Sequence, residues 1–598
     1  HEAFIYLLRS SSGIIREKIR ETFGHIISEE DEVRLANLIY YPEKMINQIK
    51  QANEYTEDWQ KTAVYRLVQI CREVSSKYTR SKVRKKMPRE FSGVIDELLY
   101  VDNTDDNKTE YYSELINTLI DVRVADSFIV VICSLIRSLT IDNLHILGDI
   151  FDRGPRPDII LEELMHFHDV DIQWGNHDIS WMGAATGNRA CICNVLRMAL
   201  GYNGFDVLED GYGINLRPLS MFAERVYRDD PCTCFLPQIL DKNIYDAVDP
   251  KLAAKMHKAI AVLQYKEEGQ IIKRHPEYGM EERILLSAIR YDRGTVTIDG
   301  KEYPMRDMNF PTVDPADPLR LTDEEEELLH TLELSFRHNA RLHEHVRFLY
   351  SNGSMYKCCN SNLLYHGCIP MTENREFDGL MVGGKMYRGK ELMDFIDTQV
   401  KNAYFLPEDA PEKEACRDFM WYLWNGAKSP VFGKDKNRSF EHYFIEDPEV
   451  MRETMNPYYQ LSEEEETCDM ILKEFGLPTK GSHIINGHMP VKIKSGETPI
   501  RAGGKLFIID GGLSKAYQER TGIAGYTLIF NSHHLALAEH KPFDPERERT
   551  PKVYIVEKMQ KRITVADTDE GKELAGRIED LKELLKAYRS GLLKERIR

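Results

Sequence analysis

The chain of 598 residues lacks a basic surplus, a long hydrophobic run and a dense cysteine cluster. Its formal net charge of −18 argues against a nucleic-acid surface, which needs excess lysine and arginine. The most apolar run, residues 127–136, covers about half a bilayer and ends at Arg137. No signal peptide is visible. We therefore expect a cytoplasmic globular protein without membrane or nucleic-acid partners.

The eleven cysteines, an odd number without dense spacing, indicate reduced thiols. Three closely spaced sets occur: Cys191 with Cys193, Cys232 with Cys234, and Cys358 with Cys359. No second pair or nearby histidine set completes a zinc site, so packing is the favoured interpretation.

Changes in hydrophobic periodicity predict a core assembled from separate pieces. The expected regions are 1–140, mostly helical and including the start of the core; 141–190, core; 191–354, a mainly helical insertion; 355–545, core; and 546–598, a C-terminal strand and helix. Apolar runs at 143–147 and 170–174 flank a helical pattern at 157–168. This order is typical of a βαβ unit with parallel strands.

Two helical patterns lie outside that unit. Residues 321–353 predict one long helix, with Thr322 and Glu325 as a capping box and its four consecutive glutamates as a solvated face. Near the C-terminus, an apolar seam predicts a helix docked on the body or on a partner subunit, because a coiled coil of this length is too short to favour. Its members are Leu574, Ile578, Leu581, Leu585 and Tyr588.

Polar side chains follow four short apolar runs at the point where each predicted strand ends: Asp149, Asn176, His366 and His488. Ligand sites of open α/β sheets lie beyond the carboxyl ends of the strands. One carboxylate, one amide oxygen and two imidazoles suit Mn²⁺, Fe²⁺, Zn²⁺ or Co²⁺ better than Ca²⁺. Asp149 has two oxygens and can bridge two metals about 3.5–4 Å apart.

Taken singly, each of these residues has an ordinary interpretation as a turn or a packed side chain. The ordered set is more specific: "GDIFDRG" (148–154), "GNHD" (175–178), "HG" (366–367) and "GH" (487–488). This set resembles the metallophosphoesterases, in the branch with serine/threonine phosphoprotein phosphatase-like signatures. The resemblance implies an α/β fold, a four-layer αββα sandwich with a helical N-terminal region and a large helical insertion.

The resemblance also implies a role for each matching position. It gives Asp149 as the bridging carboxylate, Asn176, His366 and His488 as ligands of the second metal, His177 as the general acid, Asp152 as the carboxylate that orients His177, and Arg153 as the group that holds phosphate oxygens. Asp178 stands where many relatives carry glutamate, which we interpret as a tolerated change. These roles agree with a metal-bound hydroxide nucleophile and a protonated leaving group.

Further segments extend the resemblance over nearly the whole chain and narrow it to class III fructose-1,6-bisphosphatases: "LHILGDIFDRGPRPDII", "DIQWGNHDISWMGAA", "LEDGYGINLRPL", "HGCIP" and "INGHMPVK". The family likeness implies hydrolysis of the 1-phosphate of fructose 1,6-bisphosphate in gluconeogenesis. It also implies two divalent metal ions, with Mn²⁺ as the expected ion and Fe²⁺, Zn²⁺, Co²⁺ or Mg²⁺ as alternatives. AMP and phosphoenolpyruvate are the implied effectors. A homo-oligomer is left open.

One departure concerns the first metal. The family has an Asp-x-His motif ahead of "GDxxDRG", whereas no such motif followed by glycine occurs upstream of Gly148. The opening "HEAFIYLLRSSSGIIREKI" resembles the segment just past that motif, so we expect the motif to precede His1. His1 as a substitute ligand is the less favoured interpretation.

Two other functions stay open: a phosphoprotein or nucleotide phosphatase, and a non-catalytic regulatory scaffold. The second phosphate of the substrate needs basic contacts, but the sequence favours none of the basic side chains near the motifs: Arg189, Lys357, Arg375, Lys492 and Arg501. The glycines of "AGGKLFIIDGG" favour a hairpin and tight strand packing over a phosphate contact.

Overall fold

The computed structural model describes residues 1–24, 26–100, 106–238, 249–523, 525–542 and 551–593. Its described residues form two compact units, one of residues 1–145, 162–171 and Pro551, the other of residues 146–161, 172–542 and 552–593. Helices and strands are both present, which confirms the α/β class. The boundary expected at 545 lies outside the described residues. Among the described helices, none combines the length and apolar character that crossing a membrane requires.

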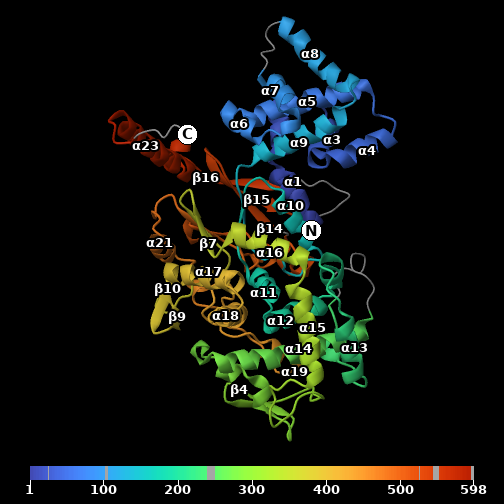
Figure 1. The fold of residues 1–598 in the computed structure, drawn as a ribbon, viewed down its shortest axis with the longest axis vertical. Helices are drawn as coiled ribbons and strands as arrows, with labels where there is room; N and C mark the ends of the chain where they lie inside the picture. The colour runs from blue at the N-terminus through green and yellow to red at the C-terminus, as the bar shows by residue number, and fades with distance from the viewer. Residues whose placement is uncertain (25, 101–105, 239–248, 524, 543–550, 594–598) are drawn as a thin grey trace. The chain divides into compact units, whose positions relative to one another are not determined.

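The first unit is a set of helices around one apolar core (blue in Figure 1). The helices are α1 (Glu2–Arg9), α2 (Ile14–Phe23), α3 (Glu29–Tyr40), α4 (Pro42–Gln51), α5 (Glu57–Ser75), α6 (Arg80–Lys86), α7 (Ser92–Tyr100), α8 (Asp106–Asp121) and α9 (Ala125–Thr140). The apolar run at 127–136 lies in α9, where Phe128, Ile129 and Ile132 are fully buried. It is therefore a core helix.

A five-stranded sheet organises the second unit, in the order β12-β13-β11-β8-β7. Its strands are β7 (Tyr356–Cys359), β8 (Asn362–Tyr365), β11 (His483–Asn486), β12 (Ile500–Arg501) and β13 (Leu506–Ile508). Strand β11 runs parallel to both neighbours, with Ile484 opposite Leu363 on β8 and Leu506 on β13. The residues that follow β8, β11 and β13 therefore emerge at one edge of the sheet.

A second sheet packs on the first. It consists of the antiparallel strands β14 (Gly525–Phe530), β15 (His534–His540) and β16 (Lys552–Lys558). Leu535 of β15 shares one apolar cluster with Leu364, Ile485 and Phe507 of the first sheet. This face-to-face contact fixes the strands whose ends carry His366 and His488.

The described residues form three further sheets. They are β1 (Leu144–Ile146), β2 (Val170–Gln173) and β6 (Gly353–Ser354); β9 (Gly379–Val382) and β10 (Lys385–Arg388); and β3 (Ile289–Arg290), β4 (Thr295–Ile298) and β5 (Lys301–Pro304). In the first of these, β2 runs parallel to β6, with Ile172 opposite Gly353.

The remaining helices are α10 (Pro157–Met165), α11 (Asn176–Ala185), α12 (Arg189–Gly201), α13 (Arg217–Val226), α14 (Pro250–Arg274), α15 (Asp323–Arg337), α16 (Ala340–Asn352), α17 (Gly389–Phe405), α18 (Lys413–Asn425), α19 (Ser439–Phe444), α20 (Tyr458–Leu461), α21 (Glu465–Glu474), α22 (Lys515–Thr521) and α23 (Asp569–Arg589). Helix α11 packs on α12 and α18, and α12 packs on α14 (Figure 1).

The prediction of one long helix over 321–353 is wrong, because α15 and α16 are separate helices. Asn339 interrupts the pattern: its Oδ1 accepts the backbone N–H of Leu342 at 2.9 Å and starts a new helix as an N-cap. The capping box of Thr322 and Glu325 is confirmed. The solvated face is wrong for Glu325, which is 1% exposed and pairs with the buried Lys266 at 2.7 Å.

The seam of α23 is not docked on the described part of the chain. Its five apolar side chains are 44–63% exposed. The expectation that this seam packs on the body of the protein is therefore wrong for the described residues.

A buried histidine makes the stability of the second unit depend on pH. His257 of α14 lies with Nδ1 2.9 Å from the Phe235 carbonyl and Nε2 2.9 Å from the Tyr443 hydroxyl. Burial lowers its pKa from 6.5 to about 3. Below pH 6.5 the unfolded chain binds a proton here that the folded chain does not bind until about pH 3, so stability falls as the pH falls through this window.

We expect the free energy of unfolding to drop, between about pH 7.5 and pH 5, by about 2 kcal/mol more in the natural chain than in His257→Gln. Urea unfolding at the two pH values measures this difference. Equal pH dependence of the two proteins would contradict the buried neutral state of His257.

Candidate metal centre

Two glycines allow the first two motifs to approach each other. Gly148 (φ 78°) and Asp149 (φ 57°) both adopt left-handed backbone conformations just beyond β1. A side chain on Gly148 would collide with the backbone of Gly175, and one on Gly175 would collide with the carboxylate of Asp149. The close turn requires glycine at both positions, and it places Asp149 against the start of α11.

Asp178 holds these two turns together. Its Oδ2 accepts the backbone N–H groups of Asp149 at 2.7 Å and Gly175 at 3.0 Å, and its Oδ1 accepts that of Phe151 at 3.3 Å. Burial, followed by the charge of Asp149, raises the pKa of Asp178 to about 7. The sequence interpretation missed this positioning role. Its signal was a carboxylate at the third position of a helix, where it can accept the cap N–H.

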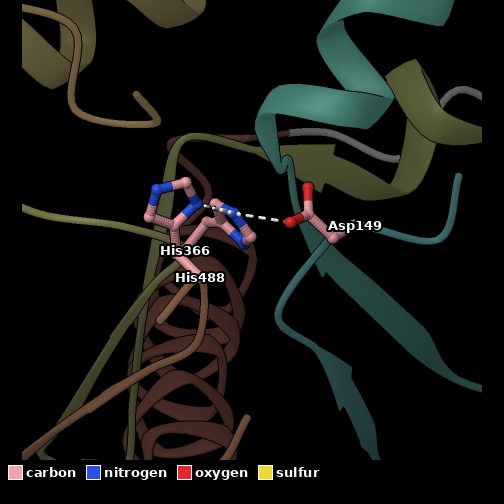
Figure 2. A group of neighbouring side chains, drawn as sticks. All are labelled: Asp149, His366 and His488. Atoms are coloured by element: carbon pink, nitrogen blue, oxygen red, sulfur yellow. Dashed lines mark hydrogen bonds and ion pairs between the residues drawn. The ribbon is translucent and has the colours of Figure 1, made fainter. Parts of the chain in front are cut away.

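The third and fourth motifs meet because β8 and β11 are parallel neighbours. The backbone N–H of Gly487 donates to the His366 carbonyl at 2.9 Å. His366 Nε2 lies 3.1 Å from His488 Nδ1 and 3.3 Å from Asp149 Oδ2. Figure 2 shows the carboxylate of Asp149 facing the two imidazole rings.

The outer nitrogens of both histidines contact backbone carbonyls. His366 Nδ1 lies 2.6 Å from the Leu147 carbonyl, and His488 Nε2 lies 3.2 Å from the Phe432 carbonyl. Since a carbonyl only accepts, these nitrogens carry hydrogens, and the opposite nitrogens, His366 Nε2 and His488 Nδ1, lie on the side of Asp149, where a metal ion would take the place of any proton. This is the orientation of histidine ligands whose tautomer is fixed by an outer hydrogen bond.

Electrostatics couples these three residues. Burial opposes the shift, but the charge of Asp149 raises the pKa of His366 to about 9. Burial and then the neighbouring His366 lower the pKa of His488 to about 3. Burial also opposes ionisation of Asp149, yet the histidines hold its pKa below the usual range. Of the two neighbouring rings, His366 therefore binds a proton more readily than His488 beside the single carboxylate of Asp149.

A second cluster shares Asp149 and contains the predicted catalytic residues. Ligand atoms of Asp149, Asp152 and His177 all lie within 4.8 Å of one another. His177 Nε2 is 3.1 Å from Asp152 Oδ1, and the His177 backbone N–H donates to Asp149 Oδ1 at 3.2 Å. None of the eleven free cysteines belongs to either cluster, nor does His1.

Arg153 is held beside this cluster by two aromatic rings. It adopts a left-handed backbone conformation (φ 53°), and its guanidinium carbon lies 4.5 Å from the ring centre of Tyr202 and 5.0 Å from that of Tyr517. Its buried Nε lies 3.4 Å from Asp152 Oδ1 in an ion pair. The rings orient the guanidinium without consuming its donors.

Asn176 and Asp510 complete the surroundings. Asn176 stands between Gly175 and His177, which both contact Asp149, and its buried Oδ1 has no hydrogen-bond partner among the described residues. Asp510 follows β13, and burial together with the charges of Asp149 and Asp152 raises its pKa to about 6. The strand-end rule applied to "KLFIID" would have identified Asp510, which the sequence interpretation missed.

The residues present fit a pair of divalent cations. One nitrogen of each imidazole and a carboxylate oxygen lie within 4.8 Å of one another, and the Asn176 amide oxygen, which has no hydrogen-bond partner among the described residues, is close by in sequence to His177. Several half-buried or buried carboxylates crowd the same edge, among them Asp149, Asp178 and Asp510, and cations would balance their charge. Nitrogen and oxygen donors without thiolate suit Mn²⁺, Fe²⁺, Co²⁺ or Zn²⁺.

Removing the Asp178 carboxylate, which holds the two turns together, should weaken metal binding. We expect Asp178→Ala to bind Mn²⁺ about 10–100-fold more weakly, because three backbone N–H groups lose their common acceptor. Titration of Mn²⁺ by calorimetry measures the change, with Asp178→Asn, which keeps one acceptor oxygen, as the conservative variant. Unchanged affinity in Asp178→Ala would remove the positioning role.

Comparisons with known proteins place the chain. The family model described as "Firmicute fructose-1,6-bisphosphatase" matches residues 1–590. Proteins named fructose-1,6-bisphosphatase class 3 from Clostridium tetani and Bacteroides fragilis are each 49% identical over 604 and 605 residues, covering 100% of this chain and 91% of theirs. That from Bacteroides thetaiotaomicron is 48% identical over 606 residues, with the same coverage. No solved structure matches the chain. The chain belongs to the class III fructose-1,6-bisphosphatase family.

Proposed function

We propose that this chain hydrolyses the 1-phosphate of fructose 1,6-bisphosphate to fructose 6-phosphate and inorganic phosphate. Family membership selects the sugar bisphosphate as substrate. The observation that carries the chemistry is the pair of clusters sharing Asp149, one rich in metal-binding nitrogen and the other holding a histidine–carboxylate pair. Together they support hydrolysis of a phosphate monoester.

Asp149, Asn176, His366 and His488 would hold the divalent cations, with Mn²⁺ as the proposed ion. When bound, the cations supply positive charge to the phosphate oxygens and lower the pKa of water. The remaining chemistry belongs to side chains of this chain.

Three residues act on the phosphate and the sugar oxygen. Arg153, whose Nε is ion-paired with Asp152 at 3.4 Å, would hold phosphate oxygens, which suit the planar fork of its guanidinium. His177 donates a proton to the departing sugar oxygen. Asp152, 3.1 Å from His177 Nε2, keeps the imidazole oriented.

The proposed architecture is a four-layer αββα sandwich. It is supported by the face-to-face packing of the five-stranded sheet on β14–β16, and by the metal-binding residues at the ends of parallel strands. Sandwiches of this kind place both sheets between helical layers.

The test uses the Mn²⁺-loaded protein with three substrates: fructose 1,6-bisphosphate, a phosphopeptide and a nucleoside monophosphate. Phosphate release should be fastest from the sugar bisphosphate, and the product should retain the 6-phosphate by ³¹P NMR. Preference for the peptide or the nucleotide would contradict the substrate. No release from any of the three would favour the non-catalytic scaffold.

A further inference from the structure

If the proposed function holds, the sugar must lie next to His177, which protonates its departing oxygen. A pocket lies there, between α11, α12 and α18, and we name it the ring pocket. Its lining includes Arg153, His177, Ser180, Asn194, Tyr202 and Trp424. All of these residues belong to the second unit, and no role has been given above to the last four as binding groups.

Trp424 has a buried donor that is unpaired in the described part of the chain. Its indole is 7% exposed, and its Nε1 is buried without a hydrogen-bond partner among the described residues. The indole ring lies 4.9 Å from the ring of His177, at an interplanar angle of 84°. A buried N–H left unpaired costs about 1–3 kcal/mol, so its presence beside the general acid indicates a ligand oxygen.

Two polar lining residues, Ser180 and Asn194, are held by a chain of hydrogen bonds. Asn194 Nδ2 donates to Ser180 Oγ at 2.8 Å, and Asn194 Oδ1 accepts from Arg197 Nη2 at 2.8 Å. Arg197 in turn donates through Nε to Gln264 at 2.7 Å. Because Ser180 Oγ accepts from Asn194, its own hydroxyl hydrogen is oriented away from that bond and can donate to a ligand.

The charge of the lining identifies what fits. Arg153 and His177 are the lining side chains that can carry positive charge, none of the lining residues is an aspartate or glutamate, and the other lining side chains are apolar, aromatic or neutral polar. A second phosphate would lack a cation there. An uncharged polyhydroxylated ring has faces for the aromatic side chains and hydroxyls for the donors.

We propose that the ring pocket binds the furanose ring of the substrate, and that Trp424 Nε1 and the Ser180 hydroxyl donate hydrogen bonds to its oxygens. The second phosphate then lies outside this pocket. Trp424 contributes in two ways: its ring packs on His177, and its N–H selects substrates that carry an oxygen at that place. A substituted side chain that keeps the ring but lacks the N–H separates the two contributions.

Trp424→Phe is that variant, and Trp421→Phe is its matched control. Trp421 lies on the same helix but outside the pocket lining, with its Nε1 donating to Glu268 Oε1 at 3.1 Å. The Mn²⁺-loaded proteins are compared on fructose 1,6-bisphosphate and on phenyl phosphate, which has no hydroxyls. We expect Trp424→Phe to lower kcat/KM about 10-fold for the sugar bisphosphate and less than about 2-fold for phenyl phosphate. Trp421→Phe should not lower kcat/KM for one of the two substrates more than for the other.

Product inhibition gives an independent measurement. The inhibition constant for fructose 6-phosphate should rise about 10-fold in Trp424→Phe, while that for inorganic phosphate stays unchanged. Equal losses on both substrates would show that Trp424 only supports His177, and no loss on either would remove the contact; both outcomes overturn the proposal. Failure of the natural chain to hydrolyse fructose 1,6-bisphosphate, with phenyl phosphate still turned over, would instead overturn the proposed function.

Discussion

Asp149→Ala is expected to lose both cations and to slow turnover by about 10⁴-fold or more. Asp149 is the residue that both clusters share: its Oδ2 lies 3.3 Å from His366 Nε2, and its Oδ1 accepts the backbone N–H of His177. Without a bridging carboxylate neither cation keeps its charge partner, and the positive charge that the phosphate needs is lost. Elemental analysis after dialysis measures the metal content.

The matched control is Asp169→Ala, an exposed aspartate just before β2, which should retain metal and activity. Asp149→Asn provides the conservative variant, which keeps the shape and one oxygen. An Asp149→Ala protein that still holds two cations would refute the bridging role.

His177→Ala is expected to keep both cations and to turn over fructose 1,6-bisphosphate about 10²–10⁴-fold more slowly. The imidazole contacts Asp152 and the ring of Trp424, and it lies outside the His366–His488 pair. Its loss should therefore remove the proton donor and leave the principal nitrogen ligands in place.

The choice of leaving group tests the acid role itself. A nitrophenolate leaves without protonation near neutral pH, so the loss in His177→Ala should be much smaller for nitrophenyl phosphate than for the sugar bisphosphate. His166→Ala, at an exposed position, serves as the control. Equal losses on both substrates would mean that His177 does not act on the leaving oxygen.

The pattern of polar residues at strand ends is enough to locate much of the centre from the sequence. Asp149, His366 and His488 follow short apolar runs, and two of those runs are parallel neighbours, so their ends coincide. The rule works because register in a buried parallel sheet is fixed by its apolar side chains. The roles of the seven predicted residues, and the regional boundaries, stay predictions.

Other parts of the site depend on contacts that sequence spacing does not reveal. Asp178 acts through three backbone N–H groups of turns that meet only in the fold. Trp424 reaches His177 from a helix almost 250 positions further along the chain, and nothing in its local pattern marks it. Asn339 interrupts a continuous helical pattern because its side chain accepts a backbone N–H at the start of a new helix, a role that asparagine favours over a place inside a helix.

The remaining expectations concern properties that side-chain geometry does not address. The donor set is shared by several divalent ions, so the choice of Mn²⁺ stays a proposal, as do AMP and phosphoenolpyruvate as effectors. The apolar seam of α23 is exposed, so a partner subunit stays the open expectation for what covers it, and the oligomeric state stays a prediction.

Anomalous diffraction from crystals of the Mn²⁺-loaded chain tests the metal centre most directly. We expect a manganese peak at about 2.0–2.3 Å from His366 Nε2, His488 Nδ1 and a carboxylate oxygen of Asp149, with the Asn176 oxygen also in reach. A second peak should lie about 3.5–4 Å away, on the other side of Asp149. Manganese bound elsewhere, with these four side chains free of it at saturating concentration, would contradict the shared metal centre.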